Sequence, residues 1–354
     1  MEVGQLKLVF KVMPFLVLGF LLSGCLPLNL LEQGPGGMFA VVLNQEGAYE
    51  PLLSGGALWL LAPDGKPQRK LLELAEEQSA GEISWAPSGG ELSLTVVQVG
   101  EYGFPEEWRI VRVPLEGEPV DIVSHDYPLI SPRYTQTGSA ILYLAIPEEE
   151  PALYRFDFAT GEEQLLADNV LAFLLSQDKV YLLDTNGAVR VLGEEDVLAE
   201  VRCPEEYCQG SLLFWPRPFL ALDPTGRYFA ISLQGEPGVV TPETDSVPSL
   251  YLVDLEGGEA WHLATPAGAP AFSPDGRKLA FAAGSVEKVR KAFLYDLETR
   301  DLEPLEGSEG VVLLSWGPSG LIAVVELADE TYRFLRWTEE GWQELLAGGA
   351  GEGS

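Results

Sequence analysis

The chain has 354 residues, of which 46% are hydrophobic and 10% aromatic, with 38 glycines and 26 prolines. This composition predicts a globular core with many turns. The formal net charge of −32 argues against direct binding to nucleic acid or to anionic lipid headgroups, because such a surface repels phosphate groups.

The first 25 residues have the organisation of a bacterial export signal. Lys7 and Lys11 flank an apolar stretch, residues 12–22, which is shorter than the about 20 apolar residues that a membrane span needs. The following Leu22-Ser23-Gly24-Cys25 resembles the lipobox of bacterial lipoproteins, in which the cysteine carries the lipid and the signal is cut just before it. The resemblance implies lipidation at Cys25, with enough acyl chains for a durable anchor. An uncleaved membrane anchor and an ordinary cleaved signal are the alternatives.

The sequence is predicted to divide into four segments. These are a signal peptide at 1–24, a lipidated N-terminus and tether at 25–37, a folded domain at 38–346 and a disordered tail at 347–354. In lipoproteins an aspartate directly after the cysteine often retains the protein in the inner membrane, and Leu26 stands in that position here. The resemblance therefore implies an exported protein anchored to a membrane through Cys25, in the outer membrane if the cell has one.

A short turn recurs along the folded domain. Its clearest copy is AFSPDGRKLAFAA, residues 271–283, in which Ser-Pro-Asp-Gly joins two apolar stretches. Proline sets φ for the first turn position, and glycine takes the left-handed position after it. The other copies are Trp85–Gly89, Tyr134–Gly138, Leu222–Gly226 and Trp316–Gly320, with degenerate copies at Leu174–Asp178 and Gly34–Gly36. Each clear copy begins with a bulky apolar residue and leads into an apolar strand that contains small residues.

A second pair of strands follows each turn. Clear examples are LYRFDFATGEEQLL from Leu153, LYLVDLEGGEAWHL from Leu250 and AFLYDLETRDLEPL from Ala292. Each unit therefore holds four short strands and recurs after 40 to 53 residues, a period typical of a β-propeller. We predict an all-β fold, a β-propeller of four-stranded blades. Seven blades are expected, with six as the alternative because the first and fourth units are degenerate.

The repeat resembles one known family. The pattern W-S-P-D-G-x-x-L-A-F, followed by I-Y-x-x-D-x-x-x-G-x-x-x-x-L, looks like the TolB-type, WD-repeat-like propeller repeat, and residues 271–305 are its best copy. TolB-type propellers are mostly periplasmic protein-binding modules, and similar repeats form the substrate-gating propeller of prolyl oligopeptidases. The resemblance implies the fold over roughly residues 36–346 and a protein partner in the cell envelope. TolB proteins also carry an N-terminal α/β domain, for which this sequence shows no counterpart.

Two cysteines remain in the exported part. Cys203 and Cys208 lie five residues apart in CPEEYC, where a disulfide can persist in an oxidising compartment. Metal binding is the alternative, but the only histidines, His125 and His262, lie far away in the sequence. We therefore predict a disulfide that closes a small ring.

Sequence motifs for catalysis are missing. There is no G-x-S-x-G nucleophile motif, no Walker-type loop and no dinucleotide fingerprint, so we predict no catalysis and no cofactor. Asp157, Asp254 and Asp296 recur at one position of the repeat, where they are expected to cap turns rather than bind calcium. Trp85 and Trp316 are expected to pack between blades rather than to form a binding stripe.

Three segments depart from the repeat and are candidates for specificity. Residues 99–108 include Tyr102, Phe104 and Trp108, residues 202–218 include the cysteine pair with Phe214 and Trp215, and residues 234–249 form a polar, proline-rich loop.

The predicted function is that of a non-catalytic, exported lipoprotein whose propeller binds a protein or peptide partner in the cell envelope. One alternative is a propeller enzyme or a metal or small-ligand binder, similar to lactonases or quinoproteins. The other is a carbohydrate-binding surface protein that uses the aromatic residues named above.

Overall fold

The structure, a computed structural model, describes nine stretches of the chain. These are residues 31–43, 54–100, 104–147, 150–176, 179–201, 219–234, 248–284, 290–327 and 332–346. Almost all of them form antiparallel β-sheets, and a short 3₁₀ turn, η1 (Pro35–Gly37), lies between the first two strands. No helix in these stretches has the length and apolar character to cross a membrane. The predicted signal peptide and Cys25 lie outside the described residues.

The first sheet has seven strands in sequence order, β1 to β7. They are β1 (Leu31–Gln33), β2 (Phe39–Leu43), β3 (Ser54–Leu61), β4 (Pro67–Trp85), β5 (Glu91–Val99), β6 (Pro105–Pro114) and β7 (Val120–His125). The long strand β4 pairs with β3 through residues 67–79 and with β5 through residues 78–85, so it joins two repeats in one sheet. The number of blades therefore stays a prediction.

Each of the other five sheets has four strands and is built from one uninterrupted stretch of chain. The second and third hold β8 (Leu129–Tyr134), β9 (Ala140–Ala145), β10 (Ala152–Asp157), β11 (Glu163–Asp168), β12 (Val170–Ser176), β13 (Lys179–Asp184), β14 (Ala188–Val191) and β15 (Val197–Glu200). The fourth and fifth hold β16 (Phe219–Leu222), β17 (Tyr228–Gln234), β18 (Pro248–Asp254), β19 (Glu259–Ala264), β20 (Ala267–Phe272), β21 (Lys278–Ala283), β22 (Lys291–Asp296) and β23 (Leu302–Leu305). The last holds β24 (Val311–Gly317), β25 (Gly320–Glu326), β26 (Tyr332–Thr338) and β27 (Gly341–Leu346).

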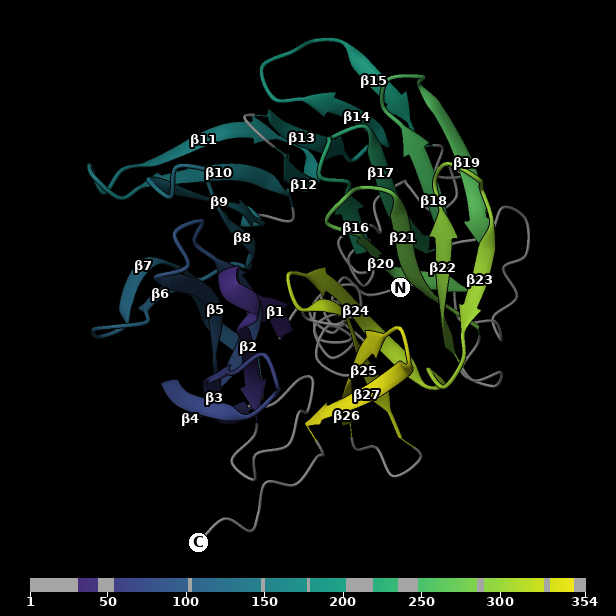
Figure 1. Ribbon diagram of the computed structural model, residues 1–354. Coiled ribbons are helices and arrows are strands. Elements are labelled where there is room, and N and C mark those ends of the chain that lie inside the picture. Colours follow the sequence, from purple (N-terminus) through teal and green to yellow (C-terminus); the bar gives the residue numbers. More distant parts are fainter. Residues whose placement is uncertain are drawn as a thin grey trace, which may run out of the picture.

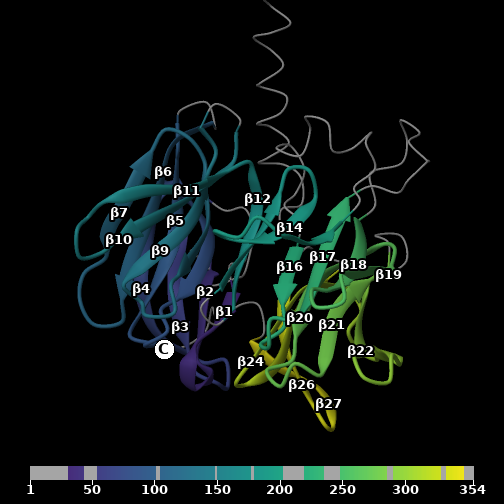
Figure 2. The same ribbon diagram turned by 90° about the horizontal axis from the view of Figure 1, so that it is seen from above.

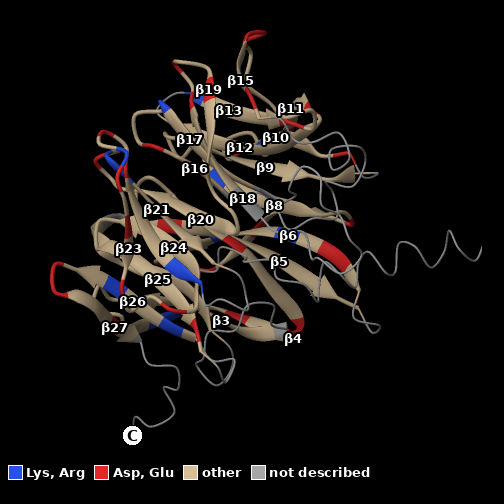
Figure 3. Cartoon of the chain, turned by 90° about the vertical axis from the view of Figure 1, so that its right-hand side faces the viewer, with Lys and Arg blue, Asp and Glu red and all other residues tan. Residues whose placement is uncertain are grey.

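The sheets form a β-propeller, as the repeat predicted. Figure 1 shows them in sequence order around a centre, with β1, β8, β12, β16, β20 and β24 nearest to it. In the turned view of Figure 2, β1, β12 and β16 again lie between the outer strands of the two sides. Acidic residues outnumber basic ones, and Figure 3 shows many of them on the turns and strand ends.

The hydrophobic core lies between neighbouring sheets. Six clusters of buried residues are found, and each combines residues from two sheets that follow one another around the ring. One of them joins the first sheet to the last, through contacts of Leu313, Ile322 and Phe334 with residues of β2 to β6. A single four-stranded sheet exposes two apolar faces, and this stacking removes both from water. The core therefore closes the ring.

Hydrogen bonds complete the closure between the first and last sheets. The Gln33 side-chain amide on β1 donates to the backbone carbonyls of Ser315 (3.0 Å) and Gly320 (3.1 Å), and its oxygen accepts from the Ser319 N–H (3.3 Å). Thus β1 belongs to the first sheet, and both β1 and η1 take part in the closure, so residues 31–37 of the segment predicted as a tether lie against the propeller.

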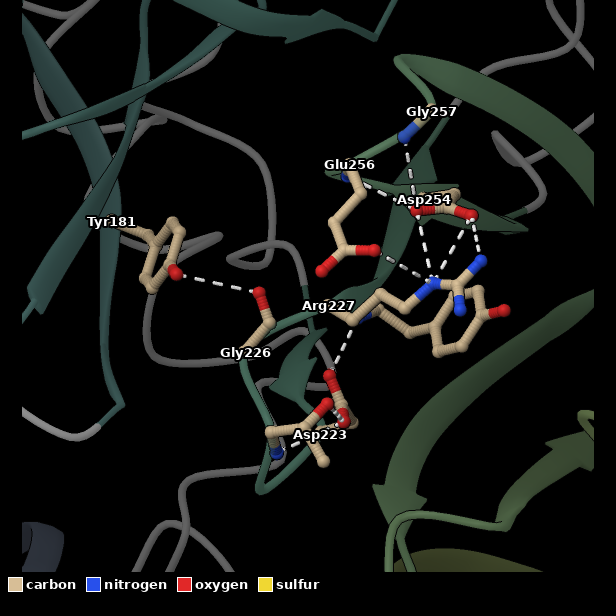
Figure 4. Close-up of polar contacts among 9 residues, drawn as sticks. Tyr181, Asp223, Gly226, Arg227, Asp254, Glu256 and Gly257 are labelled. Atoms are coloured by element: carbon tan, nitrogen blue, oxygen red, sulfur yellow. Dashed lines mark hydrogen bonds and ion pairs between the residues drawn. The ribbon is translucent and has the colours of Figure 1, made fainter.

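The recurring turns have the predicted chemistry. In the clearest copy, Gly276 has φ +67° and donates its N–H to the Ser273 carbonyl at 2.8 Å. The aspartate that recurs in the second pair of strands of each unit caps the turn that follows it, as predicted. The Asp254 carboxylate, for example, accepts hydrogen bonds from the N–H groups of Glu256 (3.0 Å) and Gly257 (3.1 Å). Figure 4 shows that it also binds the guanidinium of Arg227, at 2.8 Å. Asp157 and Asp296 make the same pairs of backbone contacts in their own turns.

The two predicted packing tryptophans are found against the core. Trp85 is buried in the cluster that joins the first and last sheets, and its indole N–H donates to the Glu32 carbonyl at 3.2 Å. Trp316 is half-buried against the cluster between the last two sheets. Trp85 therefore packs as predicted, whereas Trp316 packs against the core and also lines the cavity at the centre of the ring.

Candidate functional site

A partly open cavity of about 800 Å³ lies between the inner strands of the propeller. Its lining comes from the innermost strands of the sheets, β1, β4, β8, β12, β16, β20 and β24, and from the turn residues that follow some of them. A volume of this size fits the usual range of small-ligand and side-chain binding sites. The cavity is therefore the first candidate for a functional site.

One wall of the cavity is polar. It carries Glu32 and Gln33 from β1, Glu82 from β4, and Ser131 and Arg133 from β8. Bulges interrupt the pairing of β4 and of β8 at these points, between residues 80 and 83 and between residues 130 and 133. A bulge takes its extra residues out of the regular ladder and turns their side chains to a new direction. The irregular backbone thus supplies the polar wall.

The remaining wall is apolar. It is formed by side chains of β12, β16, β20 and β24, among them Leu171, Leu174, Leu220, Leu222 and Leu314. Acidic and basic side chains in the described lining are confined to the other wall. The cavity therefore offers one charged side and one hydrophobic side to an occupant.

Arg133 is held in place by several acceptors. Its guanidinium lies 3.5 Å from the Glu82 carboxylate and donates to the backbone carbonyls of Ile83 (3.3 Å) and Pro132 (3.0 Å). The Ser131 hydroxyl donates to the same Glu82 carboxylate at 3.3 Å. These contacts provide hydrogen-bond and ion-pair partners for Glu82, of which only 9% is exposed. They also hold the Arg133 guanidinium against β4 and β8.

Glu32 has a different environment. Its Oε2 atom is buried, and no hydrogen-bond partner for it is found among the described residues. Burial raises the pKa of the Glu32 carboxyl to about 7, with Arg133 acting to lower it and the nearby Glu82 carboxylate acting to raise it further. A carboxyl group with this pKa changes its charge near neutral pH.

Metal binding finds no support in the nine described stretches. They contain no group of three or more histidine, cysteine, aspartate or glutamate side chains that is placed to hold a metal ion. The polar wall has two carboxylates, and one of them is already bonded to Arg133 and Ser131.

The aromatic residues predicted as binding candidates do not line the cavity where they can be placed. Trp108 on β6 is half-buried and packs against two core clusters. One lies between the first and second sheets, and the other between the second and third. Phe104 is half-buried just before β6. Tyr102, Phe214 and Trp215 lie outside the described residues, and so does the predicted disulfide of Cys203 and Cys208.

The sequence contained a signal for the polar wall that was not used. Three residues before the bulky residue of the turn, five of the repeats have Glu82, Ser131, Leu171, Ala269 and Leu313, and all five line the cavity. When this position is compared across the repeats, the repeats with a polar residue there are those that form the polar wall, and the others form the apolar wall. Glu32 gives no such signal, because the first repeat is degenerate.

The chain is similar to solved β-propellers. The β-propeller domain of the Trilobed protease from Pyrococcus furiosus, described as having an open velcro topology, is 14% identical with a TM-score of 0.57, and the match covers 91% of this chain and 97% of that one. An oligogalacturonate lyase in complex with manganese is 12% identical with a TM-score of 0.54, over 86% and 83% of the two chains. TolB from Acinetobacter baumannii is also similar (14% identical, 88% and 79% covered), but its TM-score of 0.42 carries no argument.

These similarities show the fold alone. At 12–14% identity, proteins that share a propeller have unrelated activities, and the similar structures include parts of enzymes. No protein-family model and no curated protein matches the sequence. Function therefore has to be argued from the cavity itself.

Proposed function

We propose that this protein is a non-catalytic, lipid-anchored binding module whose propeller holds a protein or peptide partner in the cell envelope. The observation that carries the proposal is the central cavity, with a charged wall on β1, β4 and β8 and an apolar wall on the other inner strands. Such a pair of walls suits an amphipathic segment, because apolar area supplies affinity and a few polar groups fix orientation. Export and anchoring through Cys25 rest on the resemblance of the N-terminus to lipoproteins.

The anchor and the partner are tested together. The full-length protein is crosslinked in native membranes and recovered after solubilisation, beside a Cys25→Ala form. We expect the membrane fraction to contain lipid-modified Cys25, detected by mass spectrometry of the N-terminal peptide. A partner recovered with the anchored form supports the proposal. Unmodified Cys25 in a protein that is found in membranes would contradict the anchor.

A cavity variant tests the place of binding. Leu174→Arg puts a charge on the apolar wall, whereas Leu165→Arg changes a residue of the outer strand β11 that is 45% exposed. We expect only Leu174→Arg to lose the partner while both proteins keep the circular dichroism spectrum of the native chain. Loss with both variants, or with neither, would place the partner elsewhere.

A second candidate function is acid–base catalysis in the same cavity. The observation that favours it is the Glu32 carboxyl, whose pKa of about 7 suits a general base or acid at neutral pH. Turnover of any member of a panel of lactones, esters and glycosides would support it if Glu32→Gln abolishes that turnover. Activity that survives in Glu32→Gln would come from another site or from a contaminant.

A further inference from the structure

We propose that the polar wall of the central cavity is a subsite for an organic cation, an ammonium group carried on an apolar body such as a lysine side chain beside leucines. The inference deepens the proposed function and rests on it, because it names the chemistry of the segment that the cavity would hold. It is carried by the unpartnered Glu32 carboxylate oxygen in the cavity wall.

The charges of the wall are not balanced by the described residues. Two carboxylates, Glu32 and Glu82, face one guanidinium, Arg133, and the rest of the described lining is uncharged. Arg133 lies within 3.5 Å of Glu82 and is further bonded to two backbone carbonyls. Ionised Glu32 thus leaves one negative charge, which a cation from outside would neutralise.

A buried carboxylate without a partner is costly in its ionised form, and either protonation or a cationic partner removes that cost. An ammonium group carries three donors and matches this need. It also places the donors near Glu82 on the neighbouring strand β4. A small anion would meet two carboxylates and one engaged guanidinium, and is therefore disfavoured.

The apolar wall defines the rest of the occupant. Leucines of β12, β16 and β24 line the part of the cavity that the charged strands leave. A methylene chain or a neighbouring leucine would gain about 25 cal/mol for each Å² of apolar area that it buries there. The ligand class is therefore an amphipathic cation rather than a bare ion.

The charge of the whole chain favours the same ligand. A net charge of −32 raises the local concentration of cations and the rate at which they arrive, an effect that salt screens. The general field acts at long range, whereas the Glu32 carboxylate acts at the wall. The salt dependence of the association rate therefore reports the general field, and the loss of cation binding in a Glu32 variant reports the wall.

Proton release is the signature of this subsite. The groups that face Glu32 are Arg133 from β8 and Glu82 and the Trp85 backbone from β4. A bound cation favours the ionised form of Glu32, so binding near neutral pH expels a proton. Affinity for the cation consequently rises as the pH rises from about 6 to about 8.

The test uses hexylamine as the probe, with 1-hexanol as the neutral match, in titration calorimetry on the full chain. We expect hexylamine to bind more tightly than 1-hexanol and to release protons at pH 7, measured in buffers of different ionisation enthalpy. Glu32→Gln should weaken hexylamine by about tenfold or more at pH 8 and abolish the proton release. The matched control is Glu91→Gln, which removes a partly buried carboxylate that pairs with Arg112 outside the cavity.

Two results would overturn the subsite. One is equal binding of the amine and the alcohol. The other is an equal loss of amine binding in Glu32→Gln and Glu91→Gln. Arg133→Met adds a second check, because removal of the cation from the wall should strengthen amine binding; weaker binding in a variant with a native unfolding transition contradicts the charge argument.

A peptide arm separates the subsite from the proposed function. An acetylated and amidated Leu-Lys-Leu peptide should compete with hexylamine, and its norleucine analogue should not. If the amine binds through Glu32 and the peptide does not, the site is for free amines and the peptide-binding function falls. If the membrane pull-down yields a partner whose recovery is unchanged in Glu32→Gln, the function stands and the subsite falls.

Discussion

The Glu32→Gln substitution should make the protein more stable above neutral pH. The pKa of this carboxyl is raised from 4.5 to about 7 in the folded chain, chiefly by burial. Below pH 4.5 both the folded and the unfolded states are protonated there, and the group costs nothing. Between about pH 4.5 and pH 7 the unfolded chain ionises first, so the free energy of unfolding falls by about 3 kcal/mol in total. The glutamine variant lacks this loss.

The assay is urea denaturation at several pH values between 5 and 8, followed by circular dichroism. Relative to Glu32→Gln, the free energy of unfolding of the wild type should fall by about 2–3 kcal/mol across this range. Carboxylates with a lowered pKa, such as Asp254 and Asp296, act in another window, because their stabilisation is lost only as the pH falls below about 3.8. A difference that stays constant from pH 5 to pH 8 would show that Glu32 is solvated and ionises normally.

Three further substitutions test the framework by urea denaturation. Gly317→Ala should cost about 1–3 kcal/mol, because a Cβ atom would lie 2.8 Å from the Gln33 side chain that closes the ring; an unchanged midpoint would mean that this closure bears no stability. Asp254→Ala should cost about 2–3 kcal/mol at pH 7 by removing the turn cap and the Arg227 pair, with the cost shrinking below pH 3.8, and a cost that ignores acid would contradict the cap. Phe281→Ala should cost about 3–5 kcal/mol, since the ring is fully buried, and a loss under 1 kcal/mol would contradict the packing.

Most of the fold followed from local chemistry. The Pro-x-Gly turns set their own φ angles, and aspartates such as Asp157 and Asp254 bond to backbone groups two and three residues ahead. These contacts involve only near neighbours in the chain, so a single sequence reveals them. The four-strand period then predicted the stacking of sheets around a centre.

The polar wall could not be predicted in the same way. Glu32, Glu82 and Arg133 are separated by about 50 residues from one to the next, and they meet because β1 and β4 of the first sheet lie beside β8 of the second. Bulges also occur at the matching place in β12, β20 and β24, so a bulge alone does not reveal which repeats carry polar residues. Glu32 also lies in a three-residue strand that resembles a linker in sequence. The sequence instead pointed to aromatic residues as binding candidates, and one of them, Trp108, packs against the core.

The closure of the ring has a consequence for how such a protein changes during evolution. Every described sheet is one continuous stretch of chain, and the ends are joined by Gln33 and core contacts instead of a strand shared between first and last sheets. Duplication or deletion of one genetic unit would therefore leave every remaining sheet intact, and only the side chains at the seam would have to adapt. By the same logic, a circular permutation that joins residue 346 to residue 31 through a linker and cuts between β23 and β24 should preserve all six sheets.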